Sequence, residues 1–274
     1  MEMDLFNIIE KVKTDKPLIH CITSPIAIND CANLVLIAGA RPIMAEHPEE
    51  VSDITAMAGG LSVSLANITD ARARSVMISG NSAFLKGVPK VIDLVGITCS
   101  RLRMDIADRF IKECRPEVIK GNVSEIRALL GLAHDTSGVD TGPMDKITAG
   151  DDPGARKLLL AMRDFSEKTG SVLLATGEVD MATDGKTMWR IDNGSPSMSY
   201  VTGTGCMMSC LIATMLYGGG PLEAVLFSSS VFGIAGELAD DSQGLGSFHI
   251  HLLDEMSLMT RDKFEKYSRI SEVI

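Results

Sequence analysis

Apolar residues recur along this chain with two alternating periods. Short continuous apolar runs, such as Leu18–Ile22 and Val172–Thr176, are typical of strands buried on both faces. Between them lie longer segments, such as Ile28–Ala38 and Arg101–Cys114, whose apolar residues are three or four positions apart, as in amphipathic helices. This alternation predicts βαβ units and an α/β fold with a mostly parallel sheet covered by helices on both faces.

The same periods predict the remaining elements. Further helices are expected at 3–13, from 46–51 onward, at 71–87, after 121–122, and at 155–169, 205–217, 221–240 and 251–268. Further strands are expected at 41–45, 61–65, 90–93 and 117–120, and a β-hairpin at 181–191 around Asp184-Gly185. Residues 134–153 are polar and interrupted by Gly and Pro, which indicates a surface loop or a weak short helix. With no repeat or linker in the sequence, a single domain over 1–274 is expected.

The stretch Tyr200–Cys206 combines a short β-prone run with glycines, and an apolar helical pattern follows it. The first turn of a helix carries backbone N–H groups without internal partners and a partial positive charge. Gly203 and Gly205 would let a phosphate approach that backbone closely. Cys206 stands at the edge of this anion cradle, where the same field would favour its thiolate. The stretch therefore suggests phosphoryl transfer.

Two better-known glycine motifs fit this stretch poorly. A dinucleotide-binding fingerprint needs a third glycine where this chain has Met208, and no Walker A triplet Gly-Lys-Ser/Thr follows a glycine loop. A strand, a Gly-x-Gly and a helix are also compatible with a plain tight turn that closes a βα unit. Cys206 could equally be an ordinary buried helix cysteine.

Composition and charge narrow the class of protein. The 274 residues are 45% hydrophobic with a net charge of −10, which argues against nucleic acid or an anionic membrane as the main partner. The six cysteines follow no C-x-x-C or disulfide pattern, so reduced thiols and a cytoplasmic protein are expected. No signal peptide and no membrane span are expected either, because the sequence shows neither pattern.

Polar residues follow several of the expected strands. Asp93, Lys120, Gly121 and Asn122 lie at two strand ends, and Thr176 with Gly177 lies at a third. In open α/β sheets, ligands bind beyond the carboxyl ends of the strands. One crevice could therefore collect these residues together with the glycine turn.

With these positions assembled, the sequence resembles the hydroxyethylthiazole kinase family, which has a ribokinase-like fold of three layers. The resemblance covers nearly the whole chain, and its motifs are specific through their order and spacing. They are Pro17–Thr23, Asn29, Ala32-Asn33, Gly39–Ala45, Val91–Gly96, Gly121–Ile126, Ala175–Asp180 and Thr202–Cys206.

The resemblance implies that ATP, with Mg²⁺, phosphorylates the hydroxyl of 4-methyl-5-(2-hydroxyethyl)thiazole. Cys206 matches the position near that hydroxyl, and the amides from Gly203 through Cys206 would hold developing negative charge. The resemblance implies that Asp93 and Glu125 hold the metal. It also implies that the nucleotide is bound by Lys120, Thr176, Asn122 and Gly177, and that the thiazole is lined by Met44, Gly203 and Asn29. The family also implies a homotrimer with sites at the subunit boundaries.

Three positions depart from the family pattern. Lys120 replaces a usual arginine, which keeps the charge but loses the bidentate fork. The segment Leu94–Thr98 replaces Pro-Val-Gly-Ala-Gly beside the expected metal, and Ser24 replaces a common asparagine. These changes leave the rate and the exact alcohol open.

Other interpretations remain. A ribokinase-like pyridine-alcohol kinase or an ATP-dependent hydrate dehydratase would usually carry aspartate at the position of Cys206. A binding-only protein that has lost turnover would fit the altered Leu94–Thr98 segment and Lys120. Individually, Asp93 could cap the segment after it, Glu125 could be a first-turn acid, and Lys120 could be a solvated lysine.

Overall fold

The computed structural model describes residues 4–134, 153–240 and 244–273, so the polar segment predicted as a loop lies almost wholly outside the described residues. The described strands are short and mostly buried, as their apolar runs predict. They are β1 (Leu18–Ile22), β2 (Arg41–Ile43), β3 (Gly60–Ser64), β4 (Lys90–Asp93), β5 (Val118–Asn122), β6 (Val172–Thr176), β7 (Asp180–Thr183), β8 (Met188–Ile191) and β9 (Ile270–Glu272).

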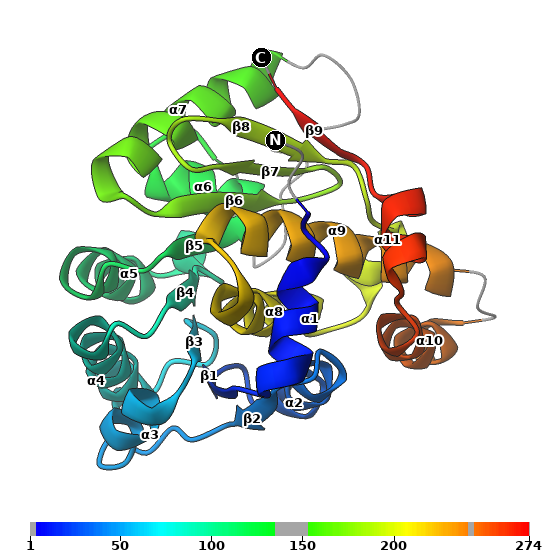
Figure 1. Ribbon diagram of the computed structural model, residues 1–274. Coiled ribbons are helices and arrows are strands. Elements are labelled where there is room, and N and C mark those ends of the chain that lie inside the picture. The colour runs from blue at the N-terminus through cyan, green and yellow to red at the C-terminus, as the bar shows by residue number, and fades with distance from the viewer. Residues whose placement is uncertain (1–3, 135–152, 241–243, 274) are drawn as a thin grey trace.

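All nine strands form one sheet in the order β2-β1-β3-β4-β5-β6-β7-β8-β9 (Figure 1). The first six run parallel, and β7, β8 and β9 continue the sheet antiparallel. This confirms the predicted α/β class with a mostly parallel sheet, and the hairpin of β7 and β8 lies where Asp184-Gly185 predicts it.

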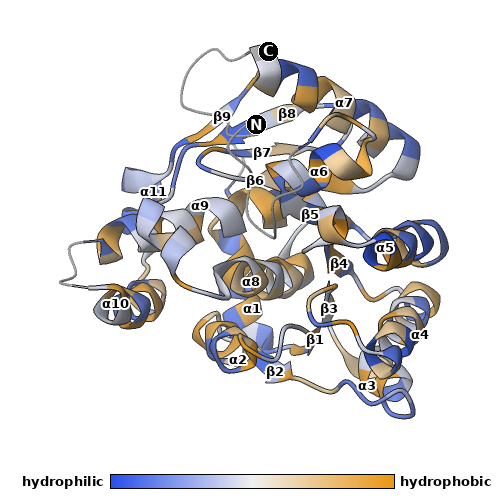
Figure 2. Ribbon diagram, turned by 180° about the vertical axis from the view of Figure 1, so that it is seen from behind, coloured by the Kyte–Doolittle hydropathy of each residue, from blue (hydrophilic) through white to orange (hydrophobic). Residues whose placement is uncertain are grey.

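Helices cover both faces of the sheet, which gives three layers (Figure 1). On one side of the sheet, a shared hydrophobic core contains residues of α1 (Asn7–Asp15), α2 (Ile28–Ile37), α8 (Thr204–Gly218), α9 (Pro221–Ala239), α10 (Leu245–Ser257) and α11 (Arg261–Tyr267). The core on the other side contains residues of α3 (Val51–Met57), α4 (Asp70–Lys86), α5 (Arg101–Cys114), α6 (Val123–Leu129) and α7 (Pro153–Thr169). The outer helices α5 and α7 show separate hydrophilic and hydrophobic stripes (Figure 2).

Successive residues of the central strands belong to different cores. Val91 and Val118 pack in the core on the α8 face, whereas their neighbours Ile92 and Ile119 pack in the core on the α5 face. This alternation is the period-two geometry of a strand. Asp93 and Lys120, two positions after Val91 and Val118, therefore face α8.

The order of the strands reverses between β1 and β3. From β1 the chain passes to the edge strand β2, and then returns to pair β3 on the other side of β1. Such a switch point leaves a crevice at the carboxyl ends of the two strands, where ligands of open α/β sheets bind. The carboxyl ends here are Ile22 and Ser64.

Two sequence predictions about elements are wrong. The run Tyr200–Thr202 before the glycines is not a strand, because Tyr200 ends the 3₁₀-helix Pro196–Tyr200 and the next two residues form a bend and a turn. The helix expected at 251–268 is two helices, since the Thr260 side chain accepts a hydrogen bond from the Lys263 amide (3.3 Å) and starts α11 anew. The short edge strand β9 then follows and pairs with β8, a partner that no local pattern reveals.

Helix α9 is the one helix in the described ranges that is long and apolar enough to cross a membrane, by length and composition alone. Of its most apolar window, 78% is buried inside the fold, as in the core helix of a globular protein.

Candidate active site

The pairing of three strands brings polar side chains into one row. Ser64 at the end of β3 lies opposite Asp93 of β4, and Asp93 lies opposite Lys120 of β5. Residues paired across strands point to the same face of the sheet. All three therefore point toward α8, and all are at most 3% exposed. Burial excludes the interpretation of Lys120 as a solvated lysine.

Helix α8 begins where the glycine turn meets this row. Gly203 has φ +94, and a Cβ there would lie 2.7 Å from the Ala27 Cβ, so the turn accepts only glycine without strain. Gly203 is the N-cap of α8 and no side chain caps the first-turn amides of this described helix. Those amides remain available to an anion, as the sequence predicts, although the preceding segment is not a strand.

The residues Asp93, Lys120 and Ser209 form a buried hydrogen-bonded group. The Lys120 Nζ donates to Asp93 Oδ2 at 3.2 Å, and the Ser209 hydroxyl of α8 donates to the same oxygen at 2.9 Å. The Lys120 Nζ also lies 3.6 Å from the position that a Gly205 Cβ would take. Burial alone would lower the pKa of Lys120, but Asp93 and other nearby negative groups raise it overall, so its ammonium stays charged beside the first turn of α8.

The Cys206 thiol faces the end of β3, with its Sγ 4.0 Å from the Ser64 hydroxyl. Burial and the Asp93 carboxylate raise the pKa of Cys206 to about 11, although Lys120 lowers it. Burial and the Asp93 charge therefore favour the thiol, contrary to the expectation of a thiolate at this position. At neutral pH the group is a thiol.

Glu125 ties two backbone segments together. Its Oε2 accepts from the Asn122 amide (2.8 Å) and its Oε1 from the Gly96 amide (2.7 Å). The first bond, with Asn122 Oδ1 accepting from the Glu125 amide, is a capping box at the start of α6. The second holds the Leu94–Thr98 segment, so this departure from the family pattern stays fixed beside Asp93. Burial and Asp93 raise the pKa of Glu125 to about 7.

The end of β6 supplies the last part of the site. The Thr176 hydroxyl lies 3.4 Å from the Gly121 carbonyl, and the exposed Gly177 donates its amide to Asp180 Oδ1 at 3.0 Å. Burial raises the pKa of Asp180 to about 6. Asp180 is a residue that sequence reasoning missed, although it stands inside the matched Ala175–Asp180 motif.

The charges at this end of the sheet do not balance. In the described part of the chain, Asp93, Glu125 and Asp180 are three buried carboxyl groups whose charges act on Lys120 or are acted on by it, and Asp93 is the one that contacts its ammonium. Within the described residues no group of three or more His, Cys, Asp or Glu side chains converges as a direct metal cage. Mg²⁺ typically keeps several waters and uses one or two carboxylates plus substrate phosphates, so a divalent cation fits this excess of negative charge.

We expect the protein without bound metal to lose stability as the pH rises from about 4.5 to about 7. A carboxyl group with a raised folded-state pKa favours folding at low pH and loses that advantage as pH rises from its unfolded to its folded value. For Glu125 that window runs from 4.5 to about 7, and the loss is on the order of a few kcal/mol. Urea unfolding at pH 4.5 and pH 7.5 measures it.

The control for this pH experiment is Glu125→Gln, which cannot ionise at that position. The difference in pH slope between the two proteins isolates Glu125 from groups of opposite sign, such as His20, whose pKa burial lowers. Equal slopes would contradict the prediction.

The residues implied for the thiazole lie at the switch-point side. Met44 directly follows β2 and packs partly buried against the core, whereas Asn29 is exposed in the first turn of α2. The structure shows no contact of Asn29 that joins it to the Lys120–Asp93 group. Ser24, which replaces a common asparagine, is 3% exposed, and its hydroxyl has no hydrogen-bond partner within the described residues.

Ser64 and Ser209 were missed by sequence reasoning. Both are buried small residues in apolar elements, where serine usually carries no message. A signal was present for Ser209, because it follows Cys206 by three positions and therefore shares its helix face.

Solved structures support the fold. A ribokinase-like superfamily protein from Enterococcus faecalis matches 93% of this chain and 95% of its own with a TM-score of 0.66 at 12% identity. A hydroxyethylthiazole kinase protein from Pyrococcus horikoshii covers 98% of this chain and 99% of its own, with a TM-score of 0.87 and 27% identity. Together with the site, these matches define a kinase with a ribokinase-like fold.

Sequence comparison gives the family. The pattern of the hydroxyethylthiazole kinase family matches residues 9–262. A hydroxyethylthiazole kinase from Clostridium botulinum is 46% identical over 262 residues, which cover 96% of this chain and 98% of the relative. Another from Methanosphaera stadtmanae is 32% identical and covers 98% of both chains. The chain belongs to the hydroxyethylthiazole kinase family.

Proposed function

We propose that this protein transfers the γ-phosphoryl group of ATP to the hydroxyl of 4-methyl-5-(2-hydroxyethyl)thiazole, with Mg²⁺ as the metal. Beyond family membership, the observation that carries the proposal is the row from Ser64 through Asp93 to Lys120. In that row, the Asp93 carboxylate and the buried Lys120 ammonium lie against the first turn of α8. The ammonium lies beside Gly205, the residue that precedes Cys206. Phosphoryl transfer needs mainly positioning and charge stabilisation, which such a site supplies.

The nucleotide side of the site follows from the ends of β5 and β6. Lys120 would neutralise phosphate oxygens, and Thr176, Asn122 and Gly177 would contact the nucleotide at the same edge of the sheet. Asp93 would hold Mg²⁺ directly or through water, and Glu125 would act through water, because both its oxygens already accept backbone amides. When bound, the metal would offset charge on the phosphates.

The alcohol side of the site lies at the switch point. Met44, Gly203 and Asn29 would line the thiazole, with its hydroxyl beside Cys206. As a neutral thiol, Cys206 would orient this hydroxyl by accepting its hydrogen bond at Sγ, and the hydroxyl proton would pass to an oxygen of the transferred phosphoryl group. The amides from Gly203 to Cys206 would stabilise negative charge on the transferred group.

We also propose a single catalytic domain, a homotrimer with sites at subunit boundaries, and a cytoplasmic location. One sheet spanning all described strands supports the single domain. The trimer is supported by exposed apolar side chains on the elements that flank Gly203, namely Ile26, Tyr200 and Leu245, at 67%, 73% and 49% exposure. The exposed Asn29 would then line the thiazole at the boundary with a second subunit.

The test is ADP release by the purified protein with ATP and Mg²⁺, with and without the hydroxyethyl thiazole. Thiazole-dependent ADP and a phosphorylated thiazole detected by mass spectrometry are expected. Thiazole binding without ADP release would favour the binding-only interpretation. If the protein neither binds the thiazole nor releases ADP, the proposed substrate is wrong. A hydroxymethyl pyridine would then be the next alcohol to assay.

A further inference from the structure

Helix α8 touches the sheet through a line of small polar contacts. The Cys210 thiol lies 3.7 Å from the Ser62 hydroxyl, and the Cys206 Sγ lies 4.0 Å from the Ser64 hydroxyl. Both contacts join neutral groups to β3. The third contact differs, because Ser209 bonds to the charged carboxylate of Asp93 on β4.

The Ser209 hydroxyl connects the cradle to the acid. Its Oγ is 2.9 Å from Asp93 Oδ2 and 3.1 Å from the Gly205 carbonyl oxygen, one turn earlier in α8. A hydroxyl has one hydrogen to donate, and a carboxylate is the stronger acceptor. The hydrogen therefore belongs mainly to Asp93, while the second contact keeps Ser209 in register with the first turn.

Two donors meet on one oxygen of Asp93. The Ser209 hydroxyl and the Lys120 ammonium both bond to Oδ2. Fixing Oδ2 from two sides sets the rotation of the carboxylate and so the direction of Oδ1. The two donors differ in what holds them: Ser209 sits on a packed helix, whereas Lys120 has a flexible stem and a second attraction, the phosphates.

We propose that Ser209 is a positioning residue that orients Asp93 toward the divalent cation. The inference rests on the proposed function, because it requires Asp93 to act on the metal. When Lys120 turns to the nucleotide, Ser209 remains as the bond that holds Oδ2. A purely structural role, in which the 1%-exposed hydroxyl only satisfies the buried carboxylate, would affect stability and leave the Mg²⁺ dependence unchanged.

The experiment compares Ser209→Ala, Ser209→Thr and the control Thr214→Ala. Thr214 is a fully buried hydroxyl on the same helix that bonds to the Cys210 carbonyl (2.8 Å). Binding of ADP is measured by calorimetry over a series of Mg²⁺ concentrations, and turnover is measured over the same series. Thermal unfolding of each variant reports its stability separately.

For Ser209→Ala we expect the Mg²⁺ concentration at half-saturation to rise about tenfold, both in ADP binding and in turnover, with the KM for the alcohol unchanged. An order of ten corresponds to the loss of one hydrogen bond to a charged group. Ser209→Thr keeps the donor and should stay within about threefold of the native protein. Thr214→Ala should leave the Mg²⁺ dependence unchanged even if it unfolds at a lower temperature.

Asp93→Asn separates the two levels of the argument. One outcome is that Asp93→Asn raises the Mg²⁺ concentration at half-saturation while Ser209→Ala leaves it within twofold of native. In that case the metal role of Asp93 stands and the positioning role of Ser209 is overturned. If neither variant changes the Mg²⁺ dependence, the proposed metal site itself is wrong and the inference falls with it. A shift for Thr214→Ala equal to that for Ser209→Ala would also overturn it.

Discussion

Asp93→Asn is expected to lower Mg²⁺-dependent turnover by about 1000-fold or more. The amide has no charge with which to hold a divalent cation, and it also leaves the Lys120 ammonium without its 3.2 Å partner. Removing one partner of a buried ion pair costs on the order of 3–5 kcal/mol, so the folded state should be destabilised as well. Initial rates over a range of Mg²⁺ concentrations measure the first effect, and urea unfolding measures the second.

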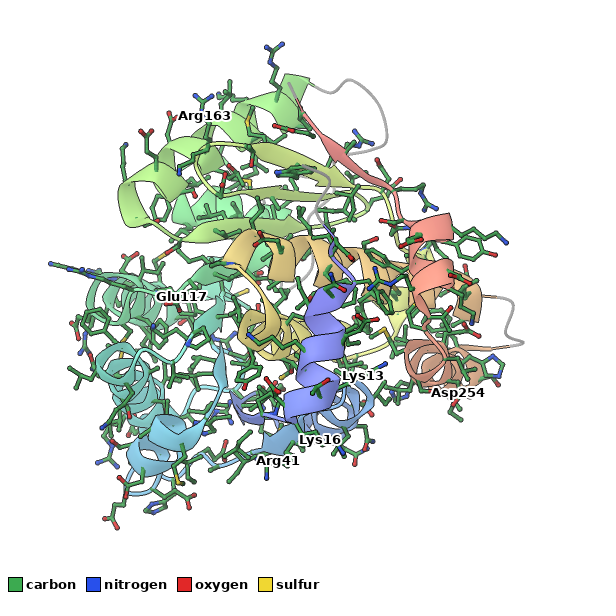
Figure 3. The ribbon with its side chains drawn as sticks, in the orientation of Figure 1. Lys13, Lys16, Arg41, Glu117, Arg163 and Asp254 are labelled. Carbon is green, nitrogen blue, oxygen red and sulfur yellow. The ribbon has the colours of Figure 1, made fainter. Side chains whose placement is uncertain are left out.

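The chain offers a matched control for this variant at the opposite end of strand β4. Lys90 begins β4 where Asp93 ends it, is 2% exposed, and its Nζ lies 3.3 Å from Glu117 Oε2. Glu117, just before β5, is labelled in Figure 3. Glu117→Gln therefore also takes a carboxylate from a buried lysine, and it should reduce stability without changing the Mg²⁺ dependence. If both variants alter turnover equally, the effect of Asp93→Asn is one of folding alone. An unaltered metal dependence in Asp93→Asn would show that the metal binds elsewhere.

Most of the sheet could be predicted from sequence because parallel strands carry a strong local signal. The bounds of β1, β4 and β6 agree with the predicted runs, since continuous burial on both faces requires uninterrupted apolar residues. The edge strand β9 could not be predicted in the same way. Its residues Ile270–Glu272 are partly or largely exposed, and their strand conformation comes from pairing with β8.

For the site, the sequence supplied candidate residues but not their electrostatics. Asp93 and Lys120 could be placed at strand ends, yet their direct pairing depends on a register that only the assembled sheet defines. The state of Cys206 was predicted wrongly because the helix field is a local property. Burial and the charge of Asp93, a residue 113 positions away (206 − 93), are not local, and both raise the pKa of Cys206.

Cys206→Ala is expected to lower turnover by roughly 100-fold while leaving ADP binding nearly intact. A positioned group that guides proton transfer contributes about 100- to 10,000-fold, and a neutral thiol with a pKa near 11 should lie at the low end of that range. Nucleotide binding should change little, because Lys120 lies on β5 and Thr176 on β6, whereas Cys206 lies on α8. Rates with saturating ATP, together with calorimetry of ADP, separate the two effects.

Cys210→Ala is the control for this prediction, since Cys210 is a buried thiol one turn further along α8 that contacts Ser62. It should reduce stability and leave turnover close to native. Cys206→Asp should preserve activity, because the Lys120 ammonium can stabilise a carboxylate there. An aspartate carboxylate is also a stronger base than a neutral thiol. The rate of this variant should hold at lower pH than that of the native protein. Native turnover in Cys206→Ala would remove the thiol from the mechanism and leave the backbone cradle and Lys120 as the groups that position the hydroxyl and the phosphate.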